Sequence, residues 1–144
     1  MTSNAARAAI LAEALRAGVD GDAGTISRLC TDDVMGWTPA RAVSSIDELL
    51  AELRRRDDAF SDTELEVIPL DVGGDFACAE WRVTMTHSGA LVLDDDAVIE
   101  PTGERVTLNG VTVAEFRDDR ICSFRQYWDE FAVFEQLGLT DDLH

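Results

Sequence analysis

Residues 76–87 read FACAEWRVTMTH, and their side chains alternate between two sets. Successive side chains of a β-strand point to opposite faces of a sheet, so a period of two marks a strand. One face of this stretch carries Ala77, Ala79, Trp81, Val83, Met85 and His87, and the other carries Cys78, Glu80, Arg82, Thr84 and Thr86. The pattern predicts one long strand from Phe76 to His87.

Further strands are predicted on both sides of this one. The segments with strand character are Thr63–Asp71, Arg105–Phe116 and Arg120–Trp128. A tight turn over residues 117–120 joins the last two. The dipeptide Asn109-Gly110 is typical of a hairpin turn. The apolar residues switch from even-numbered to odd-numbered positions across it, however, and a single bulge in one strand also produces such a switch. We favour the bulge.

Helical spacing marks the first third of the chain. A first helix is predicted from an Asn4 cap to Gly18, and a short second helix covers Asp22–Cys30. The third begins at Ser45, which forms a capping box with Glu48. Its buried face carries Ile46, Leu49, Leu50 and Leu53. A short apolar segment, Phe131–Leu137, closes the chain with Gly138 as the residue after its end.

Three helices followed by long strands predict an α+β fold. Long strands with a bulge bend a sheet into a cone, and helices across its open mouth leave a pocket lined by one strand face. We therefore expect a cone of curved antiparallel sheet with three N-terminal helices that enclose a pocket. The length of 144 residues suits a single domain over residues 1–144.

The charge balance argues against several classes of partner. Twelve Lys and Arg residues against 29 Asp and Glu residues give a formal net charge of −17, which repels phosphate backbones and anionic lipids. No apolar run approaches the ~20 residues of a membrane span, and residues 1–10 lack the apolar stretch of a signal peptide. We expect a cytoplasmic protein that binds neither nucleic acid nor membranes.

The cysteines are odd in number and widely spaced. Cys30, Cys78 and Cys122 have apolar neighbours, and no pair of them has the spacing of a metal-binding motif. We expect core thiols rather than a disulfide framework.

The order of several motifs resembles the NTF2-like superfamily, and within it the SnoaL-like polyketide cyclases. The resembling stretches are AGVD (17–20), LCTDDVMGWTP (29–39), EW (80–81), THSG (86–89), PTG (101–103), DRI (119–121), YWD (127–129) and EQLG (135–138). The resemblance covers nearly the whole chain and implies the same α+β cone. Because this fold hosts isomerases, cyclases, dehydratases, epoxide hydrolases and non-catalytic binders, the chemistry depends on individual residues.

The same resemblance shows which catalytic groups are replaced in this chain. Ketosteroid isomerases and several epoxide cyclases carry a general-base Asp immediately before a Pro, and the matching residue here is Thr38. A hydroxyl does not abstract a proton at neutral pH as a carboxylate does. Limonene-type epoxide hydrolases orient water with an Arg-x-Asp pair and a further Asp, which match Trp81, Val83 and Gln126 here. The resemblance therefore implies a pocket without the usual acid and base.

His87, Gln126 and Thr38 remain as candidate catalytic residues. His87 stands where SnoaL-like cyclases carry a His in Thr-His-x-Gly, and an imidazole exchanges protons near neutral pH. The alternative is a strand-end histidine that hydrogen-bonds the following loop. The amide of Gln126 could donate to a carbonyl oxygen and accept from a hydroxyl, or it could satisfy a neighbouring backbone group.

Apolar side chains supply the expected substrate-binding walls. Trp37, Trp81, Phe124 and Trp128 would suit a flat or polyene-like ligand, although aromatic residues in a domain of this size also form plain core. The predicted pocket lining comprises Trp37, Trp81, Val83, Met85, His87, Phe124, Gln126 and Trp128.

The remaining acidic residues point to solvent or to caps. Glu64 and Glu66 lie near the position at which polyether cyclases hold an acidic partner, but their alternation with apolar residues favours a solvated strand face. Asp129 is expected to cap the C-terminal segment. The run Asp94–Asp96 is expected in a solvated loop rather than in a metal site.

No nucleotide-binding, zinc-binding or nucleophile-elbow motif is present, so we expect no cofactor.

These observations favour a cofactor-independent cyclase or isomerase of secondary metabolism, in a pathway such as antibiotic biosynthesis. Its substrate would be a polyketide-like or other apolar, oxygenated small molecule. Orientation against aromatic walls, with hydrogen bonds from Gln126, His87 or Thr38, would suit a pericyclic or conjugate-addition ring closure.

Two other functions stay open. One is an epoxide hydrolase, epoxide cyclase or isomerase whose acid and base have moved to Glu64, Glu66 or Asp129. The other is a non-catalytic ligand-binding or dimerisation module.

A sheet face with Cys78, Cys122, Val111 and Val113 is apolar enough to predict a homodimer.

Overall fold

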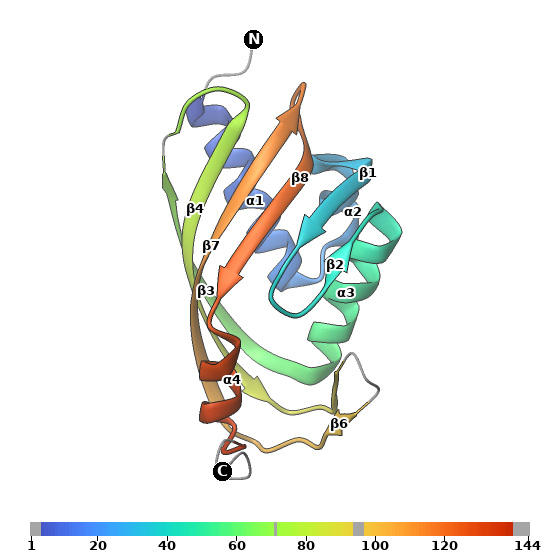
Figure 1. The fold of residues 1–144 in the computed structure, drawn as a ribbon, viewed down its shortest axis with the longest axis vertical. Helices are drawn as coiled ribbons and strands as arrows, with labels where there is room; N and C mark the ends of the chain where they lie inside the picture. The colour runs from blue at the N-terminus through green and yellow to red at the C-terminus, as the bar shows by residue number, and fades with distance from the viewer. Residues whose placement is uncertain (1–3, 71, 94–96, 140–144) are drawn as a thin grey trace.

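Helices cover one face of a strongly curved sheet in the computed structural model, which describes residues 4–70, 72–93 and 97–139 (Figure 1). The described residues form four helices: α1 (Asn4–Asp20), α2 (Ala23–Leu29), α3 (Ile46–Ala59) and α4 (Glu130–Gln136). The first three lie against the sheet, and α4 follows the last strand. None of these helices has both the length and the apolar composition needed to cross a membrane.

The main sheet of the described residues has six strands. Their spatial order is β2 (Ala42–Val43), β1 (Cys30–Trp37), β8 (Arg120–Trp128), β7 (Arg105–Arg117), β4 (Phe76–His87) and β3 (Phe60–Leu70). A separate two-stranded sheet pairs β5 (Leu91–Val92) with β6 (Val98–Ile99). The α+β cone predicted from the sequence is confirmed, with a curved and unclosed sheet.

Local sequence signals located the long elements. β4 and β8 have the predicted bounds, and the predicted inward set of β4, from Ala77 to His87, is buried. The Ser45 hydroxyl accepts a hydrogen bond from the backbone N–H of Glu48, and the Glu48 carboxylate accepts one from the backbone N–H of Ser44. The predicted C-terminal segment is α4, followed by Gly138 with a φ of +79°.

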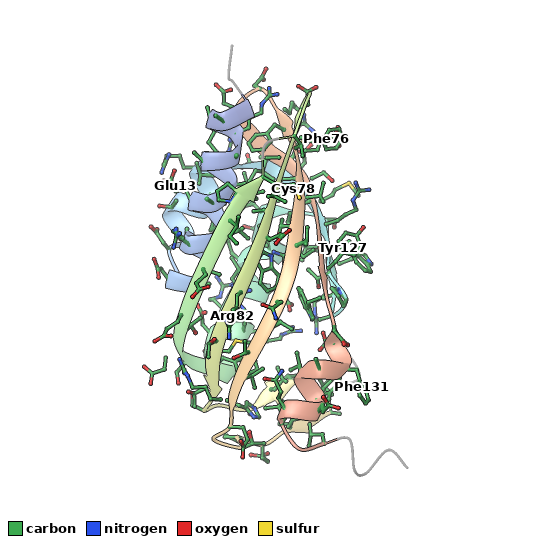
Figure 2. All side chains as sticks on the ribbon, turned by 90° about the vertical axis from the view of Figure 1, so that its left-hand side faces the viewer. Glu13, Phe76, Cys78, Arg82, Tyr127 and Phe131 are labelled. Atoms are coloured by element: carbon green, nitrogen blue, oxygen red, sulfur yellow. The ribbon has the colours of Figure 1, made fainter. Side chains whose placement is uncertain are left out.

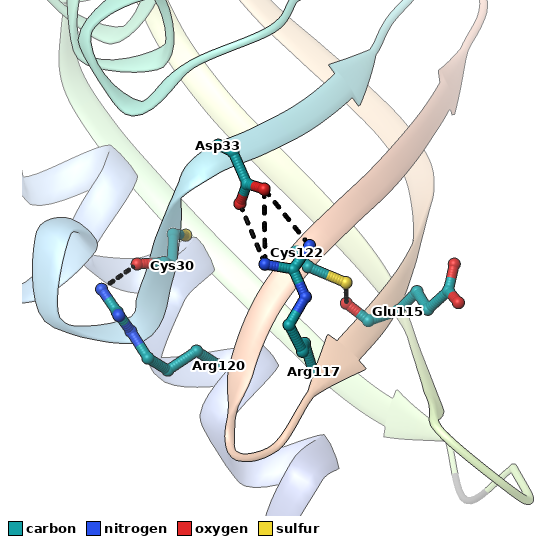
Figure 3. A network of polar contacts seen from close by, with 6 residues as sticks. All are labelled: Cys30, Asp33, Glu115, Arg117, Arg120 and Cys122. Atoms are coloured by element: carbon teal, nitrogen blue, oxygen red, sulfur yellow. Dashed lines mark hydrogen bonds and ion pairs between the residues drawn. The ribbon is translucent and has the colours of Figure 1, made fainter.

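The sheet is antiparallel as predicted except at one pair of strands, because β1 pairs with β8 in parallel. The sequence analysis missed β1 since its burial does not alternate cleanly: Cys30 and Thr31 are both buried, and Asp32 and Asp33 are both exposed. Arginines at the β7–β8 turn hold this edge of the sheet in place (Figure 3). Arg120 donates to the carbonyl oxygen of Cys30, and Arg117 forms an ion pair with Asp33.

The predicted bulge at Asn109-Gly110 is wrong. β7 pairs with β4 in one unbroken register, from Arg105 opposite Thr86 to Glu115 opposite Phe76. The apolar residues switch from even-numbered to odd-numbered positions because Gly110 and Thr112 occupy inward positions of β7, whereas Val111 and Val113 occupy outward ones. Irregular pairing occurs instead in β3, where Asp62 has a φ of 53°, and in β8 next to Cys122. Such irregularities increase the bend of a sheet.

The cysteines divide between the core and the outer face. Cys30 is buried in the apolar cluster formed by α1, α2 and the sheet, as predicted. Cys78 and Cys122 lie on the outer face and are only half-buried, so the prediction that they are core thiols is wrong. An alternating strand gives its outward positions to the sheet face that the helices leave uncovered.

Candidate functional site

A cavity of about 530 Å³ lies between the helical layer and the inner face of the sheet. Its sheet wall includes Trp81, Val83 and Met85 of β4 and Phe124, Gln126 and Trp128 of β8. Its helical wall comes from α1 and α3, with leucines such as Leu11, Leu15, Leu49 and Leu53. A cavity of this volume and apolar character suits a small organic ligand.

The Thr112 hydroxyl forms the polar centre of the sheet wall. Its oxygen accepts hydrogen bonds from the indole Nε1 of Trp81 and from the side-chain Nε2 of Gln126, each at 2.9 Å. Thr112 is 2% exposed and borders the cavity. Within the described residues, no acceptor is in place for the Thr112 O–H. Two incoming N–H donors polarise a hydroxyl and make its own proton a better hydrogen-bond donor.

The aromatic walls are positioned by glycines and by one carboxylate. The rings of Trp81 and Trp128 meet edge to face with centroids 6.1 Å apart. The Trp81 ring covers Gly110, and the Phe124 ring covers Gly36, so that a methyl group at either glycine would overlap a ring. Trp128 donates from Nε1 to the Glu130 carboxylate at 2.6 Å. These contacts define the shape of the cavity.

His87 lies at the end of β4, beyond the cavity, and is not among its lining residues. The ring is fully buried and packs against Phe60 with centroids 5.4 Å apart. Its Nδ1 accepts from the backbone N–H of Thr102, which places the proton of a neutral imidazole on Nε2. Burial lowers the pKa of His87, and a backbone hydrogen bond at Gly89 offsets part of this effect. The expectation that His87 lines the pocket is therefore corrected, and its contacts are those of a histidine bonded to the following loop.

Trp37 also lies outside the cavity, which corrects a second expected position. It is 45% exposed, and its ring packs against Tyr127 with centroids 5.4 Å apart. Gly36, the preceding residue of β1, is buried under Phe124, so Trp37 points to the opposite face of the sheet.

Thr38 borders the cavity, but its hydroxyl is occupied by a local turn. It donates to the carbonyl oxygen of Arg41 at 2.9 Å and accepts from the backbone N–H groups of Ala40 and Arg41. A hydroxyl has one proton and two lone pairs, so this turn uses its full capacity. The Thr38 hydroxyl is thus bonded within the chain.

A family model described as a SnoaL-like domain matches residues 11–124 of the sequence. The chain belongs to the SnoaL-like family. No curated protein matches the sequence of this SnoaL-like chain at a significant level.

Solved structures of several bacterial proteins have the same fold as this SnoaL-like chain. AclR of Streptomyces galilaeus, a candidate hydroxylase, is 26% identical with a TM-score of 0.78, over 94% of this chain and 83% of that one. IdmH of Streptomyces antibioticus, a candidate polyketide cyclase, is 20% identical with a TM-score of 0.75, over 92% and 98% of the two chains. An epoxide hydrolase of the LEH-like type from M. tuberculosis is 19% identical with a TM-score of 0.68, over 92% and 90%.

The acidic residues considered from the sequence lie away from the cavity of the SnoaL-like domain. Glu64 and Glu66 are exposed, in alternation with Leu65 and Val67 on β3. Asp129 caps α4, with its carboxylate accepting from the backbone N–H of Ala132. Asp94–Asp96 lies outside the described residues. The described part of the chain holds no group of three His, Cys, Asp or Glu side chains that could bind a metal ion.

Several residues that border the cavity were missed by the sequence analysis. Thr112 was missed because the switch of apolar residues from even-numbered to odd-numbered positions in β7 was interpreted as a bulge. Glu130 was missed because Asp129, one residue earlier, has the stronger capping signal. A charged group on the helical wall was also missed; it comprises Arg41, Glu52, Arg55, Arg56 and Asp57. Its only signal was the run RRRDD over residues 54–58, which is typical of a solvated helix face.

Proposed function

We propose that this SnoaL-like protein is a cofactor-independent enzyme of secondary metabolism that cyclises or isomerises a polyketide-like small molecule. The Thr112 hydroxyl supports this proposal most directly, because two donors hold its oxygen in place at the wall of an apolar cavity. A ring closure of this kind rearranges bonds within the substrate and leaves its composition unchanged. The protein then needs to orient the substrate and to stabilise the charge that develops on it.

In this mechanism the substrate lies between the aromatic side chains of the sheet and the leucines of the helices. Its carbonyl oxygen accepts a hydrogen bond from the Thr112 O–H. When a nucleophilic carbon or oxygen within the same molecule adds to the conjugated carbon, electron density moves to that carbonyl oxygen. The proton lost by the nucleophile returns to the substrate at the carbon next to the carbonyl, so the product is an isomer. In a pericyclic closure the same hydrogen bond polarises the substrate, and no proton is transferred.

The test replaces the Thr112 hydroxyl and keeps the shape of its side chain. Thr112→Val is compared with Thr84→Val, whose hydroxyl lies near that of Thr107, 3.3 Å away, on the outer face of the sheet. Hydroxy-enone thioesters of N-acetylcysteamine serve as probes, and mass spectrometry detects a product of unchanged mass. Loss of one transition-state hydrogen bond costs about 10²-fold in rate, so Thr112→Val should lose about that much. Thr84→Val should keep the wild-type rate.

The same assay separates the alternative functions. A matching epoxide probe is included, and its conversion to a diol heavier by one water molecule would indicate an epoxide hydrolase. A probe that binds without any product, across a panel of ring-forming substrates, would indicate a non-catalytic binding module. Either result, or equal rates for the two Val variants, overturns the proposal.

A further inference from the structure

The helical wall of the cavity carries three arginines that the mechanism proposed above does not use. Arg41 follows β1, and Arg55 and Arg56 lie in the last turns of α3. Glu52 and Asp57 are the two carboxylates beside them along the same wall. A third carboxylate, that of Glu130, borders the cavity at the start of α4, where it accepts a hydrogen bond from Trp128. Three guanidinium groups beside one apolar cavity are unexpected in a chain with a net charge of −17.

Two of the arginines share a single carboxylate oxygen. Arg41 forms an ion pair from Nε to Oε2 of Glu52 at 3.0 Å. Arg55 Nη1 lies 3.7 Å from the same oxygen, which is too far for a hydrogen bond. Glu52 therefore neutralises Arg41 more completely than Arg55.

Arg55 is left with an unsatisfied donor. Its Nη1 is buried and has no hydrogen-bond partner within the described residues. A buried donor without an acceptor is costly, and the cost is larger for a charged group. An acceptor supplied by a ligand in the cavity would remove this cost.

Arg56 is a second desolvated cation on the same wall. Burial lowers its pKa, and the nearby carboxylates of Asp57 and Glu52 offset part of this effect. A methyl group added at Gly18 of α1 would lie 3.5 Å from Arg56 Nη2, so the guanidinium packs directly against this glycine. An arginine keeps its charge even when desolvated, so Arg56 stays cationic.

We infer that this cavity binds an organic acid, whose carboxylate contacts Arg55 and Arg56 while its apolar body packs against the tryptophans of the sheet. The inference rests on the proposed function, since it names the class of molecule that the same cavity takes. A carboxylate supplies the two acceptor oxygens that a guanidinium fork matches, and one of them would satisfy the buried Nη1 donor of Arg55. The opposite wall offers Trp81, Phe124 and Trp128 to a flat ring system.

The test measures binding of two probes with the same shape and different charge. Anthraquinone-2-carboxylate and anthraquinone-2-carboxamide are titrated into the protein by calorimetry. Hydrogen bonds to charged groups outweigh those to neutral groups, so the wild type should bind the acid at least ~10-fold more tightly than the amide. At long range the net negative charge of the protein repels the acid and leaves the neutral amide unaffected, so a preference for the acid has to come from local contacts.

Three variants show whether Arg55 is responsible. Arg55→Gln should reduce the preference for the acid several-fold, with Arg56 still in place, and should leave amide binding unchanged. Arg54→Gln is the matched control, because Arg54 is exposed on the same helix, does not border the cavity and carries the same charge. Glu52→Gln should strengthen acid binding several-fold, since it removes the competing carboxylate; a loss of folding cannot imitate this gain.

The inference is overturned if the wild type binds acid and amide equally, if neither probe binds, or if Arg54→Gln loses as much as Arg55→Gln. These outcomes are independent of turnover. Acid-selective binding without any isomer formation would overturn the proposed function alone. Isomer formation from neutral substrates, together with equal probe binding, would overturn this inference alone.

Discussion

The indole nitrogen of Trp81 and the amide nitrogen of Gln126 lie at the same distance, 2.9 Å, from a single oxygen, the hydroxyl of Thr112. The three residues come from β4, β7 and β8, which are neighbours in the sheet. Trp81 thus forms a wall of the cavity and also orients the hydroxyl that would contact the substrate.

Because Trp81 has both tasks, Trp81→Ala should lose more activity than His87→Ala. Removal of a general base typically costs ~10²–10⁴-fold in rate, and His87, which lies outside the cavity, should lose less than this. Trp81→Phe should fall between Trp81→Ala and wild type, since it keeps the ring contact and loses the N–H donor. The measurement is kcat on folded protein, checked by near-UV circular dichroism, because Trp→Ala in a core also costs about 3–5 kcal/mol of stability. A larger loss for folded His87→Ala, with a titration near neutral pH, would establish proton transfer by His87 instead.

Gly110→Ala should disturb the shape of the cavity without the removal of any polar group. The added methyl group would overlap the Trp81 ring, which is also held by its hydrogen bond to Thr112 and its edge-to-face contact with Trp128. Overpacking of this kind costs about 1–3 kcal/mol of unfolding free energy, measured by urea denaturation. The near-UV spectrum of the tryptophans should also change. Gly73→Ala, where no atom lies near the added carbon, is the control, and equal effects of the two substitutions would contradict the predicted packing.

The stability of the protein should fall as the pH decreases below about 6.5, because of His87. Burial lowers the pKa of His87 in the folded chain from its ordinary value of 6.5. Between the folded and unfolded pKa values the unfolded chain binds more protons, so the free energy of unfolding rises with pH in this window. His87→Gln should flatten that dependence, as measured by urea denaturation between pH 5 and pH 7.5. An unchanged slope in the variant would show that other groups cause it.

The outer face of the sheet should mediate a homodimer. Ile68, Glu80, Val111 and Tyr127 lie side by side across four strands, and Ile68 and Tyr127 are 59% and 48% exposed. Figure 2 shows Phe76 and Tyr127 on the side of the sheet opposite the helix that carries Glu13. Apolar side chains in such number on one face favour contact with a second copy.

Light scattering at micromolar concentration should give about twice the chain mass of 15.8 kDa. Tyr127→Lys should shift the mass towards the monomer, whereas Asp47→Lys, on the exposed side of α3, should not. A monomer mass for the wild type would refute this interface.

Period and capping in the sequence determined most of the long elements and, along β4, the sheet face of each residue. The alternation over Phe76–His87 placed Trp81 inward, and Ser45 with Glu48 located the start of α3, because such signals depend on neighbours within a few residues. Alternation defines a face, however, and not the position of a residue along a curved strand. For this reason His87 shares the face of Trp81 and still lies beyond the cavity.

Tertiary structure alone decided which groups meet. Thr112 lies 31 residues from Trp81 and 14 from Gln126, and only the registers of β4, β7 and β8 bring their side chains together. The parallel pairing of β1 with β8 and the position of Arg55 on the cavity wall have the same origin. Contacts between segments distant in sequence depend on how the layers pack. The residue types within one segment do not specify which other segment it contacts.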